Sequence, residues 1–89
     1  LGNNFPNPFN PTTTIPVAVP RASVITLTVY NLLGEAVRVV YNGPAEAGRH
    51  WFSWDGRNDA GRSVASGVYL YKLTATTGQS FARKMILVK

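Results

Sequence analysis

Residues 24–31, VITLTVYN, alternate in character over most of their length. Ile25, Leu27 and Val29 point to one side of an extended chain, whereas Thr26, Thr28 and Tyr30 point to the other. This period of two is typical of a β-strand with one buried face. No window of about eleven residues shows the apolar spacing of a capped amphipathic helix. We therefore expect an all-β fold.

The segment upstream of this strand predicts a second strand at residues 13–19. Its inward residues are expected to be Ile15, Val17 and Val19. Pro16 interrupts it, and proline has no backbone N–H to donate to a neighbouring strand. We therefore expect this strand at a sheet edge, or locally broken at Pro16.

Downstream, residues 31–34 predict a turn in which Gly34 adopts a positive φ. Residues 36–41 then predict a strand whose inward residues are Val37, Val39 and Tyr41. The sequence Asn42-Gly43-Pro44 is expected to end this strand, because glycine and proline both disfavour a strand interior.

The rest of the chain predicts further short strands at residues 49–54, 68–76 and 80–88. Their expected inward residues are Phe52, Trp54, Tyr69, Tyr71, Leu73, Ala75, Met85 and Leu87. Gly67 begins the second of these strands, after a polar loop at 55–66 with room for a very short strand near Ser63-Val64. About seven short, mainly antiparallel strands with frequent turns indicate an immunoglobulin-like β-sandwich. Trp54 is expected to fill its centre, as a tryptophan does in immunoglobulin domains.

Residues 1–11 differ in composition from the rest. They contain Phe5-Pro6-Asn7-Pro8-Phe9-Asn10-Pro11, and prolines at this spacing exclude a helix. We interpret 1–11 as a stiff entry segment that follows a preceding passenger domain, with Phe5 and Phe9 docking on the domain at 12–89.

The composition of the chain argues against several classes of function. The net charge is +5, yet the basic residues are scattered and only Arg83 and Lys84 are adjacent, so we do not expect nucleic-acid binding. The chain has no cysteine, and no apolar run approaches the ~20 residues of a membrane helix. No signal peptide is evident, so an export signal is expected on another part of the protein.

Few residues could support catalysis. His50 is the one histidine, and a histidine-based triad needs an acid and a nucleophile beside it. The carboxylates are Glu35, Glu46, Asp55 and Asp59. Only Asp55 and Asp59 are close in sequence, and no apolar cleft can be inferred around them, so neither an enzyme nor a cofactor is predicted.

The loop Asp55-Gly56-Arg57-Asn58-Asp59-Ala60-Gly61 permits two interpretations. Its oxygen-bearing side chains are compatible with a calcium site, although their spacing is irregular and two arginines lie nearby. Asp and Asn also form turns by bonding their own backbone, and we favour that interpretation. A phosphate-binding loop is not indicated, because a strand rather than a helix follows Gly67.

Four blocks of sequence resemble one family. They are Asn4-Phe5-Pro6-Asn7-Pro8-Phe9-Asn10-Pro11-Thr12-Thr13-Thr14-Ile15, then Val29-Tyr30-Asn31-Leu32-Leu33-Gly34, then Trp54-Asp55-Gly56-Arg57-Asn58-Asp59-Ala60-Gly61 with Ser66-Gly67-Val68-Tyr69, and Lys84-Met85-Ile86-Leu87-Val88-Lys89. The chain resembles the type A C-terminal sorting domain of the type IX (Por) secretion system of Bacteroidetes, and the immunoglobulin-like domain of the flagellar hook-capping protein. Phe5, Pro16 and Trp51 depart from the family pattern.

This resemblance implies a transport function. It implies a non-catalytic signal that sends a larger secreted protein from the periplasm through the outer membrane to the cell surface or medium. The implied partners are the outer-membrane secretion machinery and its sortase-like protease, which commonly removes the domain. No membrane insertion is implied. Within the four blocks, a set of motif residues is interpreted as structural: Pro6, Asn7, Pro8, Phe9, Gly34, Trp54, Asp55, Gly56, Gly67 and Tyr69.

The last strand is the predicted recognition surface. Lys84, Met85, Ile86, Leu87, Val88 and Lys89 combine charge with apolar side chains at the end of the chain. If this strand is an edge, its free backbone groups could pair with a receptor strand. Two alternatives stay open: a structural spacer, and a carbohydrate-binding accessory module of a secreted hydrolase in which Trp51 contacts the sugar.

Overall fold

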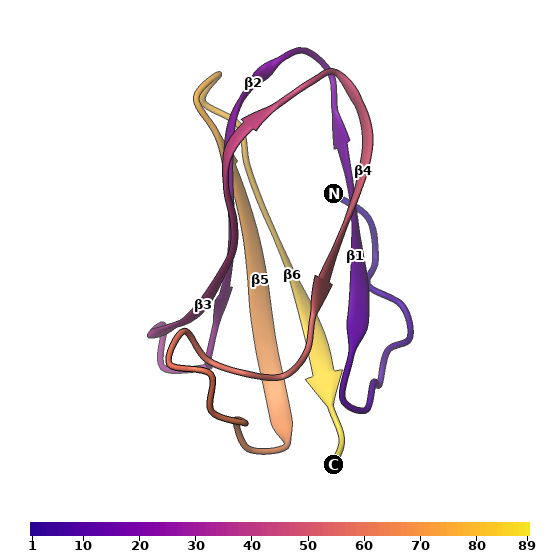
Figure 1. The fold of residues 1–89 in the computed structure, drawn as a ribbon, viewed down its shortest axis with the longest axis vertical. Helices are drawn as coiled ribbons and strands as arrows, with labels where there is room; N and C mark the ends of the chain where they lie inside the picture. Colours follow the sequence, from indigo (N-terminus) through magenta and orange to yellow (C-terminus); the bar gives the residue numbers. More distant parts are fainter.

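A computed structural model describes all residues, 1–89, as a β-sandwich of two antiparallel sheets (Figure 1). The strands are β1 (Thr13–Val19), β2 (Ser23–Tyr30), β3 (Ala36–Ala45), β4 (Gly48–Trp54), β5 (Gly67–Ala75) and β6 (Ser80–Leu87). One sheet pairs β1 with β4, and the other has the order β3-β2-β5-β6. The predicted all-β immunoglobulin-like class is confirmed. Six strands replace the expected seven, because the pairing near Ser63 is a single bridge to Arg57.

The two sheets enclose one apolar core. Its buried members come from five strands, the entry segment and the end of β3: Phe9, Ile15, Val17, Val19, Ile25, Leu27, Val29, Ala45, Trp54, Tyr69, Tyr71, Leu73, Met85 and Leu87. The inward residues expected on β1, β2 and β6 are all buried. Strict alternation in these strands made their inward faces predictable from sequence.

The prediction for β3 was wrong in two respects. Val39, expected inward, is 41% exposed, and Val40 packs against the core in its place. The register between β2 and β3 shifts at this point. Leu27 pairs with Tyr41 and the next residue, Thr28, pairs with Val39, so Val40 has no partner on β2. Such a β-bulge reverses the direction of the side chains that follow it.

Nor does β3 end at residues 42–44. It continues to Ala45, with Pro44 opposite Val24 of β2. Because β3 is the outermost strand of its sheet, Pro44 can direct its ring nitrogen away from β2 and break no ladder bond. Pro16 is accommodated similarly in β1, where it pairs with Trp51 in a sheet of two strands.

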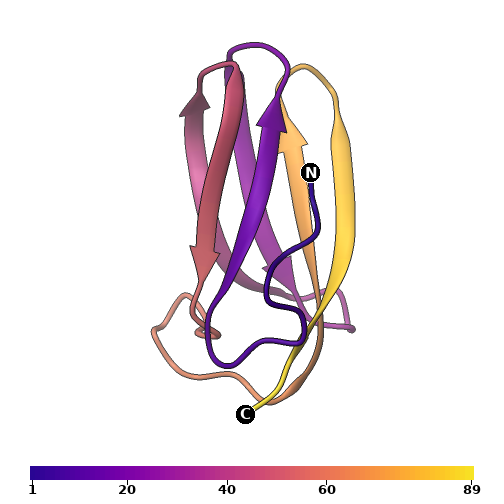
Figure 2. The same ribbon diagram turned by 90° about the vertical axis from the view of Figure 1, so that its right-hand side faces the viewer.

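The entry segment, residues 1–11, lies between β1 and β6 (Figure 2). Phe5 forms an antiparallel bridge with Thr14 of β1, and Phe9 forms a parallel bridge with Leu87 of β6. The expectation that both phenylalanines dock was half correct, since Phe9 is 2% exposed and Phe5 is 54% exposed. The segment therefore joins the facing edges of the two sheets.

Candidate functional site

The six residues predicted for recognition divide between the core and the surface. Met85 and Leu87 are buried, whereas Lys84, Ile86, Val88 and Lys89 are exposed. This division follows from the alternation along β6, whose outer face continues the outer face of β5. Only four of the six residues can therefore touch a partner without unfolding the domain.

β6 is an edge strand of its sheet, which meets the condition set for strand pairing, but the last part of that edge is occupied. The Phe9 N–H donates to the Ile86 carbonyl at 3.0 Å, and the Val88 N–H donates to the Phe9 carbonyl at 2.9 Å. The Ile86 N–H donates to Asn7 Oδ1 at 2.9 Å. The entry segment thus covers the last part of the strand against a partner.

The first part of β6 remains open. Backbone groups along an antiparallel strand point alternately to its two neighbours, and those of Ile86 point outward. Ser80, Ala82 and Lys84 share that direction, and β6 has β5 as its one strand neighbour in the sheet. An incoming strand would therefore find three residues with unpaired N–H and carbonyl groups.

Of the two adjacent basic residues, Arg83 and Lys84, the structure leaves only Lys84 free. The Arg83 guanidinium is held by the entry segment, with Nε donating to the Leu1 carbonyl at 3.1 Å and Nη1 to Asn3 Oδ1 at 3.1 Å. Neither Lys84 nor Lys89 forms an ion pair. The free positive charge of the terminal block comes from these two lysines.

A buried polar network anchors the entry segment to the sandwich. Tyr71 Oη donates to the Gly2 carbonyl at 2.8 Å and accepts from the Asn4 N–H at 3.0 Å. Asn4 Nδ2 donates to Thr13 Oγ1 at 2.9 Å, and this hydroxyl donates to the Pro6 carbonyl at 2.9 Å. Burial raises the pKa of Tyr71, while the Asn4 hydrogen bond and Arg83 oppose the rise.

The motif residues around Trp54 have structural roles. The Trp54 ring is 1% exposed and meets the rings of Phe9 and Tyr69 edge to face, at centroid distances of 5.7 and 5.3 Å. Its Nε1–H donates to the Arg57 carbonyl at 2.8 Å. Gly56 has a φ of 74°, and a Cβ there would approach the Pro11 carbonyl to 3.2 Å. The predicted central tryptophan is confirmed.

The remaining motif positions lie in turns and at strand ends. Gly34 has the predicted positive φ, 82°. Gly67 begins β5, and Tyr69 Oη donates to the Ala65 carbonyl at 2.6 Å. Pro6 and Pro8 are exposed and flank Asn7 in the entry segment.

The loop at residues 55–61 uses its oxygens in turns. Asp55 Oδ1 accepts from the Arg57 N–H at 3.1 Å, and Asn58 Oδ1 accepts from the N–H groups of Ala60 and Arg62. Asp59 Oδ1 accepts from the Val39 N–H at 3.0 Å. No group of three or more His, Cys, Asp or Glu side chains lies close enough to hold a metal ion. The favoured turn interpretation accounts for these side chains.

The two other singled-out residues lie on β4. His50 Nε2 lies 2.7 Å from the Glu46 carbonyl oxygen, and its ring stacks on Phe52 at 6.3 Å. Trp51, on the opposite side of the strand, is 60% exposed.

The structure contains no helix that is long and apolar enough to cross a membrane.

Comparison with known proteins relates these features to a family. The sequence profile of the FlgD Ig-like domain matches residues 4–79. The basal-body rod modification protein FlgD of Salmonella typhimurium is 37% identical over 57 residues, which are 64% of this chain and 25% of that protein. The Salmonella typhi protein of the same name gives equal values. This chain thus spans about a quarter of the curated relatives it matches.

Solved structures share the sandwich. FlgD from P. aeruginosa is 25% identical with a TM-score of 0.67, over 85% of this chain and 60% of that one. Latent PorU from Porphyromonas gingivalis has a TM-score of 0.71 at 24% identity, covering 97% of this chain and 9% of that one. PorZ from the same organism has a TM-score of 0.63 at 21% identity, covering 98% and 11%. The PorU and PorZ likenesses establish a shared fold, and on the profile match the chain belongs to the FlgD Ig-like domain family.

Proposed function

We propose that this immunoglobulin-like chain is a non-catalytic sorting module that directs a larger secreted protein through the outer membrane by type IX secretion. The observation that carries the proposal is the edge strand β6, which combines an open backbone at residues 80–84 with the unpaired cation Lys84. The protein passes through the periplasm and ends outside the cell or on its surface. Its partners are the outer-membrane machinery and a sortase-like protease.

Two further observations support this proposal. The four blocks that resemble the type IX sorting domain extend from Asn4 to Lys89. The same sandwich occurs in PorU and in PorZ, which is described as an essential bacterial surface component of the type IX secretion system.

Recognition would proceed by strand addition to β6. A receptor segment in extended conformation pairs with Ser80, Ala82 and Lys84, and its backbone supplies most of the affinity. Lys84 adds a charge that favours an acidic neighbour on the receptor. After Lys84 the entry segment blocks further pairing, because Asn7 and Phe9 already form hydrogen bonds with the backbone of Ile86 and Val88.

A secretion assay with point variants tests this mechanism. Deleting residues 84–89 is unsuitable, because Met85 and Leu87 are buried and their loss destabilises the domain. Ala82→Pro instead removes one outward N–H, and Lys84→Glu reverses one outward charge. Ala82→Ser and Lys72→Glu are the matched controls, since Lys72 is exposed on the neighbouring β5.

The assay fuses residues 1–89 to a signal peptide and a reporter, in a host with a working type IX system. Export of the parent and both controls, with periplasmic retention of Ala82→Pro and Lys84→Glu, is the expected result. Export of all variants alike would remove β6 from the mechanism. Retention of the folded parent domain itself would contradict the sorting function.

The family match favours a second candidate, a structural module that separates or assembles larger parts. The relative that carries this type of domain, FlgD, is named a basal-body rod modification protein. A spacer of this kind would leave export independent of β6, so the same assay separates the two candidates.

A further inference from the structure

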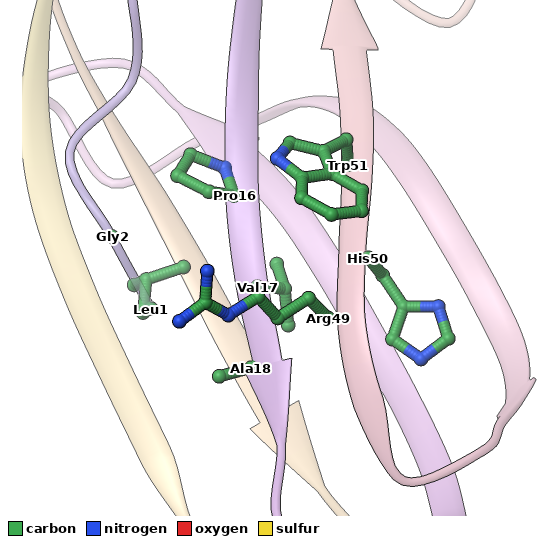
Figure 3. A pocket seen from close by; sticks show the side chains of 8 residues that line it. All are labelled: Leu1, Gly2, Pro16, Val17, Ala18, Arg49, His50 and Trp51. Carbon is green, nitrogen blue, oxygen red and sulfur yellow. The ribbon is translucent and has the colours of Figure 1, made fainter.

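The outer face of the β1–β4 sheet carries a shallow hollow that the sorting function does not use. Its volume is about 330 Å³, and it is lined by residues that include Leu1, Pro16, Ala18, Arg49 and Trp51 (Figure 3). It continues past Leu1, Ala18 and Arg49 into a second hollow of about 400 Å³ that ends at Phe81. We refer to the two together as the aromatic groove, because Trp51 and Phe81 mark its ends.

Trp51 presents a wide aromatic face to this groove. It is 60% exposed, in contrast to the buried Trp54 on the same strand. Its neighbour across the sheet is Pro16. Of the two indole N–H groups in the chain, that of Trp54 is the one that donates to a protein acceptor. An indole that is exposed and free to donate can bind a flat ligand that has both an apolar face and polar edges.

Arg49 supplies an unpaired cation next to the indole. It is two residues from Trp51 on one face of β4, a spacing of about 7 Å along a strand. Figure 3 shows its side chain reaching across β1 towards Leu1, whereas the His50 ring lies on the other side of β4. Both ion pairs of the protein involve other arginines, Arg38 and Arg57.

No carboxylate neutralises Arg49 within the groove. The four acidic residues, Glu35, Glu46, Asp55 and Asp59, are absent from the lining of both hollows. A guanidinium without a partner binds a carboxylate by paired, charge-assisted hydrogen bonds. The charge of the groove is thus complementary to a ligand that is acidic.

We propose that the aromatic groove binds an acidic polysaccharide through one uronic acid unit. The apolar face of the sugar ring stacks on Trp51, and its carboxylate pairs with Arg49. A sugar fits better than an acidic peptide, because Trp51 and Arg49 lie on the face of the β1–β4 sheet, where β1 and β4 pair with each other and offer a peptide backbone no free ladder groups. Trp51 and Arg49 both lie on β4, so the two proposed sugar contacts do not use the outward backbone groups of β6, which the groove reaches only at Phe81.

Titration of the folded chain with oligogalacturonate tests the proposal. The same oligomer with its carboxylates methyl-esterified is the neutral comparison. Trp51→Ala and Arg49→Gln should each weaken binding about ten-fold or more, the effect of losing one charge-assisted contact or a stacked ring. Leu33→Ala and Lys72→Gln are matched controls, since both residues are exposed and lie outside the groove.

The expected result is binding of the acid but not of its ester, lost in the two groove variants and kept in the two controls. A shift of the Trp51 indole N–H resonance on titration locates the sugar without any substitution. Equal weakening by Lys72→Gln and Arg49→Gln would overturn the proposal in favour of general charge attraction. Binding of a poly-glutamate peptide at least as tight as that of the sugar, or no binding of either, would also overturn it.

Discussion

Trp51 and Trp54 lie on one strand, yet one is 60% exposed and the other 1% exposed. The alternation along β4 directs them to opposite faces, which is why sequence alone distinguished them. Trp54 packs on Phe9 and Tyr69 and bonds the Arg57 carbonyl, so its loss leaves both a cavity and an unpaired acceptor.

We expect Trp54→Ala to lower the free energy of unfolding by about 3–5 kcal/mol. That loss approaches the whole stability of many small domains, so the variant should be largely unfolded at 37 °C. Urea denaturation followed by circular dichroism measures it. Trp51→Ala is the control, with an expected loss below about 1 kcal/mol, and a Trp54→Ala curve that matched it would refute the central role of Trp54.

Tyr71 makes the stability of the folded chain depend on pH in the alkaline range. Its hydroxyl is buried and donates to the Gly2 carbonyl, and this burial raises its pKa above the ordinary value of 10.0. The folded chain therefore holds this proton more tightly than the unfolded chain. The resulting stabilisation is complete below pH 10 and declines as the pH rises through the raised pKa.

The comparison with Tyr71→Phe isolates this effect. At pH 8 the variant should be less stable by about 1–2 kcal/mol, because the Asn4 N–H and the Gly2 carbonyl lose their partner. The difference between the two proteins should shrink above pH 10, since phenylalanine does not titrate. Tyr69, whose pKa is also raised by burial, is present in both proteins, so its contribution to the pH dependence cancels in the difference. A difference that stayed constant to pH 11 would exclude titration of Tyr71.

At the scale of elements, the sequence predicted strands better than it predicted pairing. The bounds of β1 and the inward faces of β1, β2 and β6 followed from alternation. The exposure of Val39 did not, because a bulge depends on which residues of β2 lie opposite. The coverage of β6 by the entry segment was missed because it too depends on distant pairing: the bond from Ile86 to Asn7 links residues 79 positions apart.

Hydrogen exchange can test that coverage at one amide. The Ile86 N–H is held by the Asn7 side chain, so Asn7→Ala should speed its exchange about five-fold, the effect of one hydrogen bond of about 1 kcal/mol. The Met85 amide is the internal control, because its backbone faces β5 and not the entry segment. Unchanged exchange at Ile86 would show that Asn7 does not protect the edge.

At the scale of the whole molecule, the entry segment closes the sandwich. On one side the two sheets are joined covalently where β3 leads into β4, and on the other side the entry segment bridges β1 and β6 (Figure 2). Tyr71 and Arg83 fasten its first residues, and Phe9 enters the core. The proline-rich motif predicted a stiff segment, but periodicity is local and could not show that this segment meets the other end of the chain.

Removing Phe9 should therefore weaken the whole domain and not only its first residues. Phe9→Ala is expected to cost about 3–5 kcal/mol, and each kcal/mol lowers the melting temperature of a domain this size by about 4–8 °C. A drop of at least about 12 °C in a single transition is the expected calorimetric result. Phe5→Ala is the matched control within the same motif, because Phe5 is 54% exposed and should change the melting temperature by less than about 4 °C. Equal melting temperatures for the two variants would mean that the entry segment is peripheral, and β6 would then expose its whole edge to a partner.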